Sequence, residues 1–187
     1  RLIDVLDSEG RLDDTIVILT SDHGELFERG IWGHSTEVLY EPVIHIPLVI
    51  RYPGQTERRD IRTPTSSLDV LPTLCGVAGK TIPDWCEGHV LPARESDVHS
   101  AAYERSIFAV DSKTAPRKGP LRRGTLMLRQ GQHKLIRYFG YDGIDREYEL
   151  YDLEKDPEER VDLYDDRPGW LSGMMNSLNG KMGDLSW

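Results

Sequence analysis

The sequence predicts an α/β protein with a mostly parallel sheet flanked by helices, followed by a small antiparallel sheet and a terminal helix. Two short apolar runs bounded by turn residues, 15–21 and 46–51, indicate buried strands in the first half. After about residue 101, strand-like runs follow one another without an intervening helical pattern, which is typical of an antiparallel sheet. We therefore expect residues 1–97 to form part of an α/β core and residues 98–187 to form a small α+β subdomain.

Local signals in the first half support this order of elements. Residues 1–9 have an amphipathic pattern that stops at Gly10, which predicts the end of a helix. Residues 66–69, Ser-Ser-Leu-Asp, have the form of a capping box and open a second helix that Gly79 closes. The stretch 24–40 has no clean period, so we expect a long loop with a short helical piece. Long ordered loops in compact domains are usually functional.

The second half contains four runs rich in strand-forming residues, joined by turns that carry glycine. We expect strands over 106–110, 125–129, 134–139 and 147–153, and a terminal helix after residue 168. Four polar residues of this region are expected to be structural: Arg137, Tyr138, Glu149 and Asp152. Asp152, Glu154 and Asp156 are expected to make turn and cap contacts around Pro157.

Composition and charge exclude several classes of function. The 187 residues are 38% hydrophobic and 29% charged, which is typical of a globular protein with a core. The net charge of −9 argues against nucleic acid or an anionic membrane surface as the main partner. No apolar run approaches the roughly 20 residues of a membrane span. Cys75 and Cys86 have no metal-binding spacing, and we expect them to be free thiols.

The segment TSDHGE, residues 20–25, places ionisable side chains at the end of the strand 15–21. Asp22 and His23 offer one oxygen and one nitrogen ligand at a strand end, where ligands commonly bind in open α/β sheets. The pair is compatible with Ca²⁺, Mn²⁺ or Zn²⁺ and does not select among them. The alternative is structural: Asp22 caps the following turn and His23 makes a local hydrogen bond.

A longer series of motifs follows TSDHGE in a characteristic order. The series is GHS (33–35), LYE (39–41), HIPLVIRYPG (45–54), SLDVLPTLCGVAG (67–79), GQHKLIRY (131–138) and ELYDLEKDPEERVDL (149–163). In this order the chain resembles the sulfatase family of the alkaline phosphatase superfamily, from about residue 2 to residue 163. The resemblance implies an alkaline phosphatase/sulfatase-like fold.

The resemblance also implies roles for particular residues. Asp22 and His23 would complete a divalent-metal site, usually for Ca²⁺, and His34 would contact the sulfate or assist the leaving group. Sulfatases also use a cysteine or serine, followed closely by Pro or Ala and then Arg, which is converted to formylglycine. Neither Cys75 nor Cys86 has this context. We therefore expect the C-terminal portion of a sulfatase, inactive alone, with an empty or weak metal site and a sulfate ester as the substrate of the whole enzyme.

Other interpretations remain open. A phosphodiesterase or phosphonate monoester hydrolase of the same superfamily is the nearest alternative, because sulfate and phosphate esters share their shape. A non-catalytic domain that retains the fold is another. The sequence begins at Arg1 within an amphipathic pattern and carries no localisation signal, so we interpret it as a piece of a longer protein. Apolar surface exposed by truncation would then favour self-association.

Overall fold

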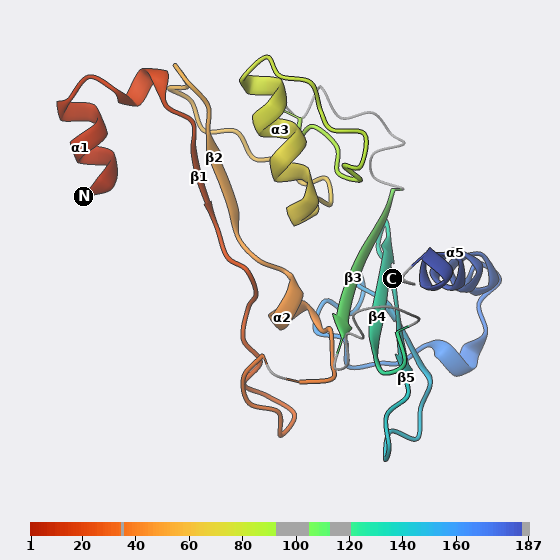
Figure 1. Cartoon of the computed structure of the whole chain (residues 1–187). Helices are drawn as coiled ribbons and strands as arrows, with labels where there is room; N and C mark the ends of the chain where they lie inside the picture. The colour runs from red at the N-terminus through yellow and green to blue at the C-terminus, as the bar shows by residue number, and fades with distance from the viewer. Residues whose placement is uncertain (35, 93–104, 113–120, 185–187) are drawn as a thin grey trace. The chain divides into compact units, whose positions relative to one another are not determined.

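The structure is a computed structural model that describes residues 1–34, 36–92, 105–112 and 121–184 (Figure 1). Within these ranges, no helix is long and apolar enough to cross a membrane.

The chain forms two compact units. The first comprises Arg1–Thr36 and Tyr40–Arg58, and the second comprises Glu37–Leu39 and Arg59–Trp187. The boundary that the sequence predicted, between residues 97 and 98, lies outside the described residues.

The first unit contains short elements on either side of a long loop. They are α1 (Leu2–Ser8), a 3-10 helix (Leu12–Asp14), β1 (Val17–Thr20), α2 (Glu41–Ile44) and β2 (Leu48–Arg51). The predicted strands 15–21 and 46–51 therefore both exist, with ends trimmed by a few residues. The N-terminal helix is confirmed as well.

The direction of these strands differs from the prediction. β1 and β2 lie side by side as an antiparallel pair, with Val17 opposite Arg51 and Thr20 opposite Leu48 (Figure 1). The mostly parallel sheet is therefore not confirmed, since both described sheets are antiparallel. An apolar run marks a strand but does not specify its direction. In its described residues, the connection between these strands contains the four-residue α2 and no crossover helix, so it does not impose the parallel arrangement.

The second unit contains the helix whose start the sequence predicted near residue 66. A 3-10 turn (Ser67–Asp69) leads into α3 (Val70–Val77), and Ser66 and Asp69 form the expected capping box. The Asp69 carboxylate is fully buried, where it accepts from the Ser66 backbone N–H at 2.8 Å and pairs with Arg105 at 2.8 Å. Because the Asp69 carboxylate is both hydrogen-bonded and paired with a cation, its burial is tolerated.

Among the described residues, a four-stranded sheet, a 3-10 helix (Tyr164–Asp166) and one α-helix follow α3. The elements are β3 (Ser106–Ser112), β4 (Gly124–Gln130), β5 (His133–Phe139), β6 (Tyr148–Asp152) and α5 (Leu171–Asp184). The strands pair in the order β3-β4-β5-β6, each antiparallel to its neighbour, so the predicted antiparallel sheet and terminal helix are confirmed. The two residues between β4 and β5 are too few for a crossover, so these two strands can pair only in the antiparallel direction.

The core of the second unit lies between one face of this sheet and α5. It consists of Leu126, Leu128, Leu135, Tyr148, Leu150, Leu171, Met174 and Leu178. Each fully buried leucine contributes roughly 1.5–3 kcal/mol relative to an exposed one. α5 contains four glycines or asparagines among its first ten residues, so its stability comes from this packing and not from helix propensity.

Candidate functional site

The candidate site begins where the chain leaves β1. The backbone N–H of His23 donates to Asp22 Oδ1 at 3.0 Å, and the Ser21 hydroxyl donates to the His23 carbonyl at 2.6 Å. Backbone hydrogen bonds from Asp22 itself and from His23 lower the pKa of the Asp22 carboxyl, and the nearby imidazole lowers that pKa further. Asp22 is therefore an ionised, acceptor-only group, with its side chain 86% exposed.

Gly24 lets the segment that follows β1 pack closely against the backbone of α2. Its N–H donates to the Val43 carbonyl at 2.7 Å, and a Cβ at this position would overlap the carbonyl oxygen of Pro42. Only glycine permits such a close backbone approach. This contact holds Asp22 and His23 at a defined place on the first unit.

A short antiparallel bridge then brings Glu25 and His34 together. Leu26 and Gly33 exchange both backbone hydrogen bonds, at 3.3 and 2.8 Å. In this register Glu25 lies opposite His34, and His34 Nδ1 is 2.7 Å from Glu25 Oε1. The loop therefore contains a bridge where the sequence predicted a short helical piece. Of residues 24–40, all but Ser35 are described, and none of the described residues is helical.

His23 completes a three-residue cluster with Glu25 and His34. His23 and Glu25 are two residues apart along the chain, and both side chains lie beside His34. The imidazoles of His23 and His34 stack with ring centroids 3.8 Å apart and an interplanar angle of 28°. The three side chains each offer a ligand atom, and these atoms all lie within 4.8 Å of one another.

The hydrogen bonds of His23 determine which of its nitrogens is available. His23 Nδ1 lies 2.9 Å from the Gly24 carbonyl oxygen, which only an N–H can satisfy, so Nε2 carries the free lone pair. Nε2 lies 3.6 Å from Asp22 Oδ2. Two ligands at right angles around a cation with bonds of about 2.3–2.6 Å lie roughly 3.3–3.7 Å apart. Asp22 and His23 therefore fit two positions on one divalent ion.

The structure thus groups the three residues singled out from the sequence and adds a fourth. His23 contacts both Asp22 and His34, as the preceding distances show. Glu25 was missed, although it belongs to the quoted TSDHGE segment. The two-residue spacing of His23 and Glu25 was available as a signal, but the Leu26–Gly33 register was not.

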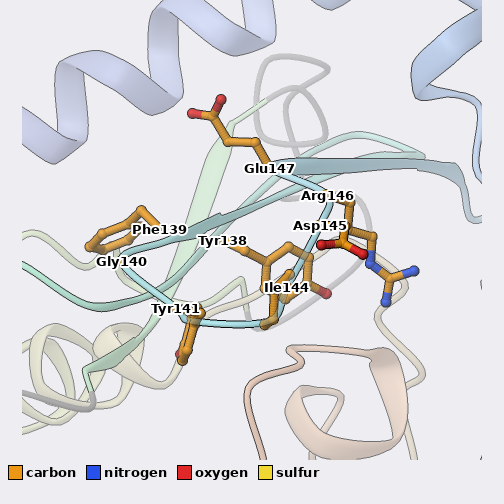
Figure 2. Close-up of a pocket in the computed structure, with 8 residues that line it drawn as sticks. All are labelled: Tyr138, Phe139, Gly140, Tyr141, Ile144, Asp145, Arg146 and Glu147. Atoms are coloured by element: carbon orange, nitrogen blue, oxygen red, sulfur yellow. The ribbon is translucent and has the colours of Figure 1, made fainter.

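A separate pocket of about 310 Å³ lies in the second unit, between the end of β5 and the following turn (Figure 2). It is lined by Tyr138, Phe139, Gly140, Tyr141, Ile144, Asp145, Arg146 and Glu147. The Tyr138 hydroxyl donates to Glu149 at 2.6 Å, and Arg146 pairs with Glu149 at 2.7 Å. These polar groups are engaged with one another, consistent with the structural role expected for Tyr138 and Glu149.

Comparison with known proteins identifies the class. Residues 1–80 match the family model described as Sulfatase. A choline-sulfatase from Rhizobium meliloti (strain 1021) is 33% identical over 173 residues, which are 90% of this chain and 31% of that protein. An N-acetylglucosamine-6-O-sulfatase from Bacteroides thetaiotaomicron is 30% identical over 88% of this chain and 29% of that protein.

Solved structures agree with this assignment. A phosphonate monoester hydrolase from Silicibacter pomeroyi matches with a TM-score of 0.75 and 26% identity, over 98% of this chain and 37% of that one. A structure solved with its substrate D-glucosamine-2-N,6-O-disulfate matches with a TM-score of 0.72 and 26% identity, over 97% and 36%. The chain belongs to the sulfatase family and has its alkaline phosphatase-like fold. It spans about 30% of the length of the curated relatives named above.

Proposed function

We propose that this chain is the C-terminal portion of a sulfatase that hydrolyses sulfate esters by a metal-assisted formylglycine mechanism. The observation that carries the proposal is the grouping of Asp22, His23 and His34 at one point of the first unit, in a chain whose relatives are sulfatases. The nucleophile is assigned to a part of the enzyme outside this chain, because Cys75 and Cys86 lack its sequence context.

Asp22 and His23 are proposed as metal ligands, with Ca²⁺ as the ion of the complete enzyme. The lowered pKa of Asp22 keeps its carboxylate ionised, and the Gly24 carbonyl directs the His23 lone pair at Nε2 outward. A bound divalent cation would neutralise the sulfuryl oxygens and favour ionisation of the nucleophile. The two residues supply only part of the six to eight ligands that Ca²⁺ takes.

His34 is proposed to contact the sulfate or to protonate the leaving-group oxygen. Its Nδ1 is held by Glu25 Oε1, which fixes the ring and directs Nε2 away from the carboxylate. In the imidazolium form, Nε2–H is the donor available to an alkoxide leaving group. The Glu25 carboxylate, 2.7 Å from the ring, holds the imidazole in this orientation.

The test is a hydrolysis assay on the complete protein that contains these residues, with a chromogenic aryl sulfate as substrate. We expect His34→Asn to lower kcat by about 10²–10⁴-fold, which is the usual contribution of a general acid. His45→Asn is the matched control, because His45 is 73% exposed and also lies beside a glutamate, Glu41. Equal activity of His34→Asn and the parent protein would refute the role of His34.

A phosphonate monoester hydrolase is the second candidate, and the similarity to the Silicibacter pomeroyi enzyme favours it. The same assay series distinguishes the two functions if a phosphonate monoester is run beside the aryl sulfate. A kcat/KM higher for the phosphonate would replace the sulfatase proposal. No turnover of either ester would support a domain that retains the fold without catalysis.

A further inference from the structure

We propose that His23, Glu25 and His34 form a binding site for Zn²⁺ within this chain. This site differs from the oxygen-rich Ca²⁺ site proposed for the complete enzyme, because it needs no ligand from outside the 187 residues. It shares only His23 with the Asp22–His23 pair. The inference therefore stands or falls independently of the sulfatase activity.

The geometry of the three side chains carries the proposal. One ligand atom from each lies within 4.8 Å of the other two. Around a tetrahedral Zn²⁺ with bonds of about 2.0–2.2 Å, ligand atoms lie roughly 3.3–3.5 Å apart. Closing the site therefore shortens the longest separation by up to about 1.5 Å and widens the 2.7 Å contact between Glu25 Oε1 and His34 Nδ1, whose shared proton the ion replaces. The side chains are 38%, 40% and 45% exposed, so a rotation of each is open to them and an ion can reach them from solvent.

The ligand set selects the kind of metal. Two imidazole nitrogens and one carboxylate suit Zn²⁺ and its transition-metal neighbours, and they are the protein ligands of several catalytic zinc sites. Ca²⁺ instead requires six to eight oxygens, of which Glu25 provides at most two. The fourth position of a tetrahedral site is left to water.

The surrounding backbone already orients these ligands. The Gly24 carbonyl accepts from His23 Nδ1 at 2.9 Å, which leaves Nε2 free to coordinate. A backbone carbonyl on the second ring nitrogen is the usual support for a metal-binding histidine. Glu25 and His34 are held opposite each other by the Leu26–Gly33 bridge, so two of the three ligands need no loop closure. Less ordering entropy is therefore lost when the ion binds.

Occupation by Zn²⁺ has a consequence for the proposed catalytic residues. The ion would engage His23 and His34, which the sulfatase proposal assigns to a metal ligand and to a substrate contact. Zn²⁺ bound here would therefore inhibit the complete enzyme and would not replace Ca²⁺.

The experiment is calorimetric titration of the 187-residue chain with Zn²⁺, alongside Co²⁺ titration followed by visible absorption. We expect micromolar or tighter Zn²⁺ binding with a stoichiometry of one, and the intense d–d bands of four-coordinate Co²⁺. Glu25→Gln and His34→Asn should each weaken Zn²⁺ binding by about 10–100-fold. His45→Asn, which alters the exposed His45–Glu41 pair of the same unit, should change it less than about twofold.

Circular dichroism spectra identical to that of the parent chain show that the variants are folded. If His34→Asn does not fold, Glu25→Gln carries the test, because this substitution removes a charge from a side chain that is 40% exposed. Millimolar Ca²⁺ should leave the Zn²⁺ isotherm unchanged. Zn²⁺ binding weaker than about 100 μM overturns the proposal, as does equal loss of affinity in His45→Asn and Glu25→Gln.

Discussion

The ammonium group of Lys134 and the carboxylate of Glu159 lie 2.7 Å apart, and neither side chain is exposed to solvent. Lys134 is on β5, whereas Glu159 lies in the turn that follows β6 with a φ of +53°. The ion pair thus fastens a strained turn to the sheet. Its desolvation cost is large, so each charge depends on its partner.

We expect Glu159→Gln to lower the free energy of unfolding by about 3–5 kcal/mol, because it removes the carboxylate charge that lies 2.7 Å from the buried Lys134 ammonium. Denaturant unfolding followed by circular dichroism measures this loss. Glu158→Gln is the control, since the Glu158–Arg160 pair is more than half exposed on both sides and should contribute less than about 1 kcal/mol. A loss of similar size in both variants would contradict this account. The double variant Lys134→Met/Glu159→Met should recover much of the stability.

Gly24→Ala should destabilise the first unit by about 1–3 kcal/mol, because the added methyl overlaps the Pro42 carbonyl oxygen. Hydrogen exchange at the Gly24 and Gly33 amides reports the local effect. Gly173→Ala in α5 is the matched control: an added Cβ there meets nothing within 4 Å, and alanine favours the helix. The prediction fails if Gly24→Ala leaves protection at both amides unchanged.

The partly buried position of His133 leads us to predict that the stability of the fold depends on pH. Burial against Trp170, whose ring centroid is 3.7 Å away, lowers the pKa of His133 from 6.5, while the Asp152 charge partly opposes this shift. The folded state then binds fewer protons than the unfolded state, so stability rises with pH. The contribution of His133 to the free energy of unfolding is fully present above pH 6.5. It is lost as the pH falls from 6.5 through the lowered pKa of His133.

We expect the difference in unfolding free energy between about pH 5.5 and about pH 7.5 to shrink in His133→Gln. Chemical denaturation at both pH values measures this difference. An unchanged difference would show that His133 does not titrate with folding.

The Asp22–His23 pair should bind Ca²⁺ no more tightly than about millimolar in this chain, which is the range of weak sites. The two residues offer at most three ligand atoms, so water must occupy the remaining positions. Calorimetric titration with Ca²⁺ tests this expectation. Micromolar affinity that Asp22→Ala abolishes would show that the chain holds a complete calcium site.

Leu19 and Val49 predict self-association of the isolated chain. They are cross-strand neighbours on β1 and β2, and they are 63% and 59% exposed. Exposed apolar patches of this kind favour association. Light scattering should show a concentration-dependent increase in mass that Leu19→Lys reduces. A monomer at all concentrations would contradict the prediction.

The contacts of Asp152 show which features short sequence patterns can predict. The sequence predicted turn and cap contacts around Pro157, and Asp152 Oδ1 accepts from the backbone N–H groups of Glu154 and Lys155 at 3.2 and 3.3 Å. Asp156 likewise accepts from the N–H groups of residues 160 and 161. The antiparallel strands and the capping box of α3 were predictable for the same reason, since hydrogen-bonding partners a few residues apart leave their signature in short patterns.

Only the tertiary structure decided the features that depend on contacts between segments distant in the sequence or without a clear pattern. The antiparallel direction of β1 and β2 was not predictable, because an apolar run reads the same in either direction. The contact between Glu25 and His34 depends on the Leu26–Gly33 register, and a slip of one residue would turn His34 to the opposite side of the bridge. The sequence alone thus indicated the sulfatase family and singled out Asp22 and His23 as candidate ligands. Only the folded loop joined His34 and Glu25 to that pair, because register is a property of backbone pairing and not of residue type.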